Sequence, residues 1–431
     1  MTRRKSYLAL FSLFLFSPLL HAQETIYSLQ DHLDIVWVLV AGVLVFFMQA
    51  GFALLETGMS RAKNAVNVMM KNYTDVCMAS VIFWLIGYSL MFGENTTGFF
   101  GFSGIGLAGD TPFDYAYLFF QAMFAATAAT ICSGAMAERT KYNSYILSAA
   151  VLIALVYPIY GSWVWNGGGW LAQLGFIDFA GSTVVHSIGA WCALAGIIAV
   201  GPRLGRFDKR TGETRPIQGH NLTLVGIGGF ILWFGWFGFN PGSTLAAVPD
   251  IASIAINTHL AASAGALGSI LTFVLRGKPV LMTSVVNGSL AGLVAITAGC
   301  ASMSIEFAMI TGFVGGIICV LGTDLLLKLQ VDDVVGAVPV HGFSGAWGTL
   351  AAGMFVSGDL FNVDQIVVQL IGIGAGFLWA FPISFLVYFL ISKIMGLRSD
   401  SLHEQRGLDV TEHAEIGFPE FQQNQTFKAG S

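Results

Sequence analysis

Eleven apolar stretches recur along the chain, and each is close to the ~20 residues that cross the hydrocarbon core of a bilayer as a helix. They span about 34–57, 75–93, 116–137, 143–164, 180–201, 221–240, 248–275, 280–298, 305–327, 336–356 and 366–395. Only 10% of the residues are charged, whereas a soluble domain carries roughly 25%. The pattern therefore predicts an all-α polytopic membrane protein with eleven transmembrane helices, whose solvent is the lipid bilayer.

The basic residues test this count independently, because Lys and Arg gather in the cytoplasmic loops of membrane proteins. Past the first 22 residues, every Lys and Arg follows an odd-numbered span, and the alternate loops hold Asp and Glu only. These residues are Arg61, Lys63, Lys71, Arg139, Lys141, Arg203, Arg206, Lys209, Arg210, Arg215, Arg276, Lys278, Lys328, Lys393, Arg398, Arg406 and Lys428. We therefore expect a cell inner membrane protein with its N-terminus outside and its C-terminus inside.

The domain organisation is expected to be simple. Residues 1–22 have a basic start, a short apolar run and a small residue, Ala22, at a plausible cleavage point, which is typical of a signal peptide. The alternative is a twelfth, retained helix. Residues 23–395 form the transmembrane domain and residues 396–431 a polar cytoplasmic tail. The net charge of −5 gives no reason to expect a nucleic-acid partner, and five scattered cysteines predict neither a metal site nor disulfides.

The fifth and tenth spans resemble one another. The fifth contains VHSIGAW at residues 185–191, and the tenth contains VHGFSGAW at residues 340–347. The two spans are expected to run in opposite directions, which predicts an inverted repeat of five plus five helices with one extra C-terminal helix. In such transporters the substrate path lies between the two halves.

Histidines are the main ionisable groups within the predicted spans, and such groups are functional candidates because burying them in lipid is costly. The repeat should bring His186 and His341 together at mid-membrane, where two neutral imidazoles can share a proton between ring nitrogens. A bis-histidine haem is the rival interpretation, although nothing else in the sequence supports a cofactor. For His259, contact with a neighbouring helix is the simpler explanation.

Aromatic residues gather at the outer ends of the third, fourth and sixth spans. They are Phe119, Phe120, Phe124, Trp163, Trp165, Trp236, Phe237 and Phe239, and Ser243 follows the last of them. An interfacial aromatic belt is one explanation, and a cage for an ammonium-like cation is the other. Asp178, which stands before the fifth span, could cap that helix or act on the cation.

Five segments together resemble the ammonium transporter (Amt/Mep/Rh) family. They are GFALLETG at 51–58, RAKN at 61–64, DFAGSTVVH at 178–186, WFGFNPGS at 236–243 and VHG at 340–342. The resemblance covers residues 30–415 and implies a homotrimer with one pore per subunit. It also implies an outer ammonium site of Phe120, Trp165 and Ser243, gate rings Phe124 and Phe239, pore-lining histidines His186 and His341, and Asp178 as supporting acid.

The chain departs from the family pattern at three places. Asn166 follows Trp165, which leaves Trp163 as the alternative in the outer site; Pro241 stands where alanine is frequent; and Gly336 replaces an acid that many relatives carry. The tail resembles the family's regulatory tail, next to a docking surface for PII-type signalling proteins.

These observations together predict a transporter, not an enzyme. It should recruit ammonium, remove a proton and conduct ammonia through an apolar pore. Two alternatives are an ammonium sensor, which would be expected to carry a larger output domain than this tail, and a membrane electron carrier or enzyme that uses the two histidines as ligands.

Overall fold

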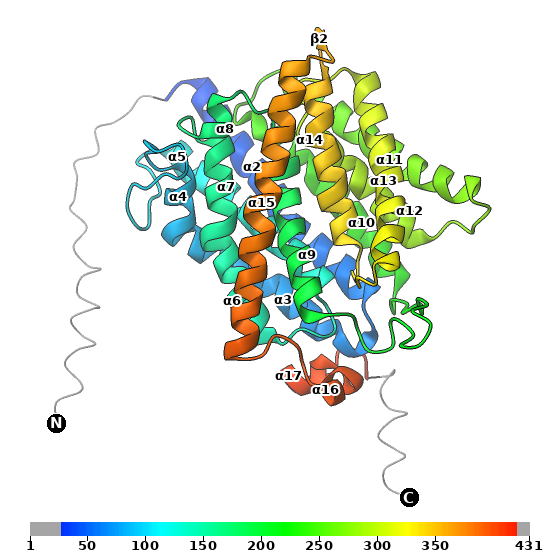
Figure 1. Cartoon of the computed structure of the whole chain (residues 1–431). Coiled ribbons are helices and arrows are strands. Elements are labelled where there is room, and N and C mark those ends of the chain that lie inside the picture. Colours follow the sequence, from blue (N-terminus) through cyan, green and yellow to red (C-terminus); the bar gives the residue numbers. More distant parts are fainter. Residues whose placement is uncertain (1–26, 420–431) are drawn as a thin grey trace, which may run out of the picture.

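The computed structural model describes residues 27–419, and the long helices lie side by side in one bundle (Figure 1). The helices are α2 (Leu29–Met59), η2 (Ala62–Asn64), α3 (Ala65–Met78), η3 (Ala79–Gly87), α4 (Tyr88–Phe92), α5 (Pro112–Ala135), α6 (Tyr142–Val151), η4 (Leu152–Val156), α7 (Tyr157–Trp165), α8 (Trp170–Gln173), η5 (Ser182–Ser187), α9 (Ile188–Val200), α10 (Leu222–Phe239), η6 (Pro241–Thr244), α11 (Asp250–Leu275), α12 (Met282–Ile296), α13 (Ile305–Lys328), η7 (Val338–Phe343), α14 (Ser344–Met354), α15 (Val363–Ile394), α16 (Ser401–Arg406) and α17 (Leu408–His413). A short hairpin, β1 (Phe355–Val356) and β2 (Asp359–Leu360), joins α14 to α15.

The prediction of an all-α, multi-pass membrane protein is confirmed. Within residues 27–419, nine helical segments are long and apolar enough to cross a membrane. Two shorter segments, α12 and the η7–α14 pair, lie where the eighth and tenth spans are expected. The total of eleven spans therefore stays a prediction, and the expected signal peptide at 1–22 lies outside the described residues.

The second membrane helix begins earlier than the sequence suggests. It was expected from residue 75, but α3 starts at Ala65, so Lys71 is a helical residue. The expectation that Lys71 belongs to a connecting loop is therefore wrong. Its side chain and that of Asp75 are fully buried, and these polar residues in the N-terminal part of the helix kept the hydropathy pattern from showing where it begins.

The ends of the bundle differ. We call the end that carries α16 and α17 the tail face, and the end that carries the start of α2 and the β hairpin the opposite face (Figure 1). The tail packs on its own chain at the α2–α3 turn, where Lys63 Nζ donates to the Glu404 carbonyl at 2.7 Å and Asn64 Oδ1 accepts from the Leu408 amide at 2.9 Å.

The bundle is built from two halves that face each other. Helix α2 packs along α10, α5 packs on α9, and η5 contacts η7. The segments η5 and η7 are π-helical, and each contains one histidine of the repeated motif. Single π-helical turns of this kind occur frequently at functional sites.

A buried ionic network joins the connecting segments of the tail face. Arg203 forms two side-chain hydrogen bonds to the Asp332 carboxylate, at 2.8 and 2.9 Å, and one to Glu138 at 2.9 Å. Arg61 also pairs with Glu138. Burial alone would raise the pKa of Glu138, but Arg203 and Arg61 hold that pKa below its ordinary value. The network therefore ties segments from both halves together through charges that lie almost wholly out of water.

Arg203→Ala should destabilise the protein by about 3–5 kcal/mol, because it removes the buried counter-charge that Glu138 and Asp332 share. Arg61 and Arg206 remain beside these two carboxylates. The measurement is thermal unfolding in detergent near neutral pH, where these carboxylates are ionised. A lowered pKa means that their stabilising effect is present above the ordinary carboxyl range and is lost only as the pH falls through the lowered pKa values. Arg215→Ala is the matched control, since its pair with Asp208 is exposed and should contribute at most about 1 kcal/mol. Equal losses in both variants would contradict the role given to the network.

Candidate functional site

The two histidines of the repeated motif lie side by side in the centre of the bundle. His186 Nδ1 and His341 Nδ1 are 3.2 Å apart, and the ring planes are inclined by 22°. Both side chains are buried. At this distance one ring nitrogen must donate and the other accept, so the contact requires one proton between the two nitrogens. The juxtaposition expected from the inverted repeat is therefore present in the structure.

An acid eight residues before each histidine holds the start of its helix. Asp178 accepts the amide of Gly181 at 3.0 Å and those of Thr183 and Val184 at 2.9 Å. Burial raises the pKa of Asp178 to about 6, although these amide hydrogen bonds oppose that shift. The helix-capping role considered for Asp178 is thus present in its geometry.

Asp333 repeats this arrangement in the second half. Its carboxylate accepts the amide of Gly336 at 3.0 Å and that of Val338 at 2.8 Å. Gly336 has φ +77°, as Gly181 has φ +110°, so a glycine fits both turns. A side chain at position 336 would also meet the Asn287 amide 2.8 Å from its Cβ. This backbone conformation disfavours the acid that the family pattern places there.

Aromatic rings form a wall from His186 toward the opposite face. Phe239 stacks on His186 with ring centres 5.2 Å apart and on Phe124 with centres 4.0 Å apart. Phe120 contacts Phe124 at 4.5 Å. All three phenylalanines are at most 1% exposed, so their rings are buried against one another.

Trp165 and Ser243 lie beyond these rings and are only half-buried. Trp165 contacts the Phe124 ring at 6.1 Å and donates its indole N–H to the Asp178 carbonyl at 2.8 Å. Ser243 donates its hydroxyl to the Phe239 carbonyl at 2.7 Å, which leaves the hydroxyl oxygen available as an acceptor. The structure brings Phe120, Phe124, Trp165, Phe239 and Ser243 to one end of the path.

The alternative tryptophan, Trp163, faces away from this end. Its indole donates to the Phe99 carbonyl at 2.6 Å, and its ring packs on Trp170 and Trp379. Trp165 is therefore the residue beside the rings. His259 lies on the exposed surface of α11, where its ring is 5.3 Å from Trp233, and it takes no part in the path.

Sequence reasoning did not place three residues of this region beside the histidines: Trp236, counted only among the outer aromatic residues, Asp333 and Glu56. Trp236 stacks on His186 with ring centres 5.1 Å apart. Asp333 could have been found from its spacing, because it precedes His341 by the same eight residues that separate Asp178 from His186. Glu56 lies within one of the family-like segments, and it lines a small cavity next to His341.

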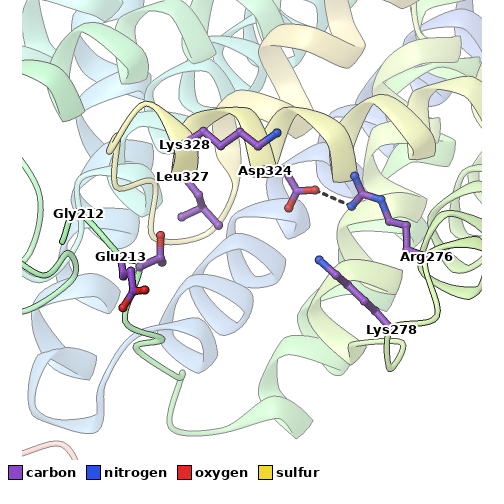
Figure 2. A pocket seen from close by; sticks show the side chains of 8 residues that line it. Gly212, Glu213, Arg276, Lys278, Asp324, Leu327 and Lys328 are labelled. Atoms are coloured by element: carbon purple, nitrogen blue, oxygen red, sulfur yellow. Dashed lines mark hydrogen bonds and ion pairs between the residues drawn. The ribbon is translucent and has the colours of Figure 1, made fainter.

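A larger pocket of about 630 Å³ opens on the tail face. Figure 2 shows Arg276 and Asp324 joined by an ion pair, with Lys278 and Lys328 nearby. None of the residues that line this pocket belongs to the path past the histidines. It is therefore separate from the site described above.

The fold and this site define a multi-pass membrane protein with a buried imidazole pair, flanked by stacked aromatic rings, at the centre of its helix bundle. The ammonium transporter family model matches residues 36–418. Ammonium transporter Amt2 of Archaeoglobus fulgidus is 46% identical, with 90% of this chain and 88% of that protein covered. The chain belongs to the ammonium transporter family, whose members are transporters and not enzymes.

Further ammonium transporters and solved structures of the same kind are also similar to this chain. A putative ammonium transporter of Synechocystis sp. is also 46% identical, with 88% of this chain and 73% of that protein covered. A solved structure described as a sensor Amt protein superimposes with a TM-score of 0.86 and 36% identity, covering 89% of this chain and 99% of that one. Mep2 of Candida albicans gives a TM-score of 0.79 at 30% identity, covering 86% and 87%.

Proposed function

We propose that this protein recruits ammonium among Phe120, Trp165 and Ser243, removes a proton, and conducts ammonia past His186 and His341. The observation that carries the proposal is the 3.2 Å contact between the two buried imidazoles at the centre of the path. A full charge at mid-bilayer costs from ~3 to more than ~10 kcal/mol. Passage as neutral ammonia avoids that cost, and potassium-like cations cannot take this route because they have no proton to give up.

The histidine pair suits a neutral substrate that forms hydrogen bonds. Because the Nδ1 atoms face each other, the Nε2 atoms are directed away from the shared contact, and His186 Nε2 has no hydrogen-bond partner among the described residues. An unpaired ring nitrogen in a buried path can accept from, or donate to, a passing ammonia molecule. Two protonated rings at this distance would repel each other, which disfavours a cationic pair.

The half-buried end of the path suits a small cation before it loses its proton. Ring faces of Phe120 and Trp165 attract a cation by about 0.5–2 kcal/mol. The Ser243 hydroxyl oxygen and the Asp178 carbonyl oxygen add hydrogen-bond acceptors nearby. The Asp178 carboxylate adds negative charge. Phe124 and Phe239 then act as the gate between this vestibule and the histidines.

We further propose a cell inner membrane location, with the opposite face outside and the tail face in the cytoplasm. The basic residues of the connecting segments support this orientation. A homotrimer, cleavage of residues 1–22 and a PII-type partner at the cytoplasmic face are proposals that rest on the family resemblance.

A second candidate function is ammonium sensing through the same pore. The similarity to a structure described as a sensor Amt protein is the observation that favours it. Solid-supported membrane electrophysiology on proteoliposomes given an ammonium pulse, together with uptake of labelled methylammonium, separates the two. A protein that binds ammonium but carries no flux in either measurement would be a sensor only.

The orientation can be tested with a reporter fused after Ser431. We expect alkaline phosphatase to be inactive there and a cytoplasmic fluorescent protein to be bright. Activity of the phosphatase fusion alone would overturn the proposed topology.

Trp165→Leu and Ser243→Ala should weaken recruitment of ammonium while the protein still assembles. Loss of the cation–π contact should cost about 0.5–2 kcal/mol, seen as a higher ammonium concentration for half-maximal uptake. Trp163→Leu is the matched control, because that ring faces away from the path. The vestibule would be assigned wrongly if both path variants kept the wild-type concentration dependence.

His186→Asp and His341→Glu should change what passes the pore. A carboxylate at mid-pore supplies a counter-charge that the neutral pair lacks, so potassium or methylammonium should gain current relative to ammonium. The double alanine variant should lose the proton relay and carry little ammonium-driven current. Proteoliposomes at matched protein density, with equal potassium and ammonium gradients, provide the comparison. If all variants keep the wild-type selectivity and turnover, the two histidines serve only in packing and take no part in transport.

A further inference from the structure

We propose that Glu56 is the proton donor that converts ammonia back to ammonium on the cytoplasmic side of the histidine pair. This inference rests on the proposed function. It concerns a cavity of about 20 Å³ on the other side of His341 from the aromatic gate. That volume can hold one water-sized molecule, and ammonia is of similar size.

Glu56 is the one acidic residue among those that line this cavity. His341, Phe52, Asn287 and Gly336 line it as well, and the remaining wall is apolar. A molecule that leaves the histidine pair toward the tail face therefore meets the Glu56 carboxyl group next to His341. Gly336, where the family pattern has an acid, offers no side chain to this wall.

The carboxyl group of Glu56 is held in place without a cation. It is 1% exposed, and its Oε2 accepts from Asn72 Nδ2 at 2.7 Å. None of the ion pairs formed within residues 27–419 includes Glu56. A buried carboxyl group without a counter-charge is costly. The Asn72 side chain does not need Glu56 as a hydrogen-bond acceptor, because its amide also donates to the Val68 carbonyl at 3.1 Å. A functional reason for this acid is therefore favoured.

The groups around Glu56 leave it free to exchange a proton. Helix α3 carries Lys71 and Asp75 on either side of Asn72, the residue that donates to Glu56. The Lys71 ammonium lies 5.1 Å from the centre of the Tyr145 ring and has no hydrogen-bond partner among the described residues. The neutral Ser133 on α5 and Asn287 on α12, with His341 on η7, complete the surroundings of the carboxyl group and its cavity.

The inverted repeat shows what is particular about this acid. Phe52 contacts His341 with ring centres 6.1 Å apart, much as Trp236 contacts His186 at 5.1 Å. Four residues after Phe52 stands Glu56, and four residues after Trp236 stands Asn240. Asn240 is buried and donates to the Thr258 hydroxyl at 3.0 Å, whereas Glu56 accepts from Asn72. At equivalent places of the repeat, the vestibule side of the histidine pair thus has the neutral amide of Asn240, and the tail-face side has the acid Glu56.

The proposed step balances as follows. Ammonia enters the cavity and takes the proton of the Glu56 carboxylic acid: the O–H bond breaks, an N–H bond forms, and a carboxylate–ammonium pair results. Ammonium then leaves to the cytoplasmic water, and hydronium from that water returns a proton to the carboxylate. Each cycle releases one proton in the outer vestibule and consumes one from the cytoplasm, with no redox change.

The test compares Glu56→Gln with wild type in proteoliposomes, with internal pH varied at fixed external pH. Glutamine keeps the shape and an oxygen acceptor for Asn72, so the protein should assemble and unfold as wild type does. We expect turnover to fall at least about a hundredfold, the low end of what a positioned proton donor contributes, and its dependence on internal pH to flatten. Glu56→Asp should restore part of the turnover and part of its dependence on internal pH. Asp75→Asn is the matched control, a buried carboxylate that does not line the cavity, and should keep the wild-type pH dependence.

Infrared difference spectra recorded on addition of ammonium supply a readout that needs no transport. The carboxyl band should change in wild type and in Asp75→Asn but not in Glu56→Gln; if Glu56→Gln fails to assemble, an unchanged carboxyl region in wild type decides against the proposal. Wild-type turnover and pH dependence in Glu56→Gln would overturn this inference alone. Absence of flux in wild type would instead overturn the proposed function.

Discussion

The geometry of the histidine pair depends on two carboxylates that satisfy backbone amides inside the bundle. A helix that starts within a membrane exposes N–H groups that have no water to pair with. Asp178 and Asp333 accept those groups at equivalent places in the two halves. The turns that they cap present His186 and His341 to each other. Without these caps, two helices could not begin so close to the centre, and the pair would have no fixed geometry.

The same symmetry explains how much of the site could be predicted from sequence. The repeated motif predicts that His186 and His341 meet, because inverted halves bring equivalent positions to a common axis. Apolar length and the alternation of basic loops predict the fold class. The equal spacing of Asp178 and Asp333 from their histidines was available as well, and it identifies the second cap without any structure.

Other features depend on contacts between distant segments and could not be read from a local pattern. The start of α3 was misplaced because Lys71 and Asp75 resemble loop residues until the surrounding helices bury them. The choice of Trp165 over Trp163 depends on which ring faces Phe124, and the two residues are separated by roughly 200° of helical rotation. The ion network around Arg203 joins three connecting segments, which sequence separation conceals.

A symmetric backbone with different side chains has a physical consequence for transport. In the proposed mechanism, neutral Asn240 lies near the vestibule, where ammonium would lose a proton, and Glu56 lies beside His341, where ammonia would gain one. An acid that lowers the barrier for protonation lowers it equally for the reverse reaction, so it changes rates and not the equilibrium. The direction of net flux must then come from the ammonium and proton gradients. In the proposed mechanism the asymmetry makes the pH of the tail-face side control the reprotonation rate, because Glu56 can exchange a proton there and the equivalent Asn240 cannot.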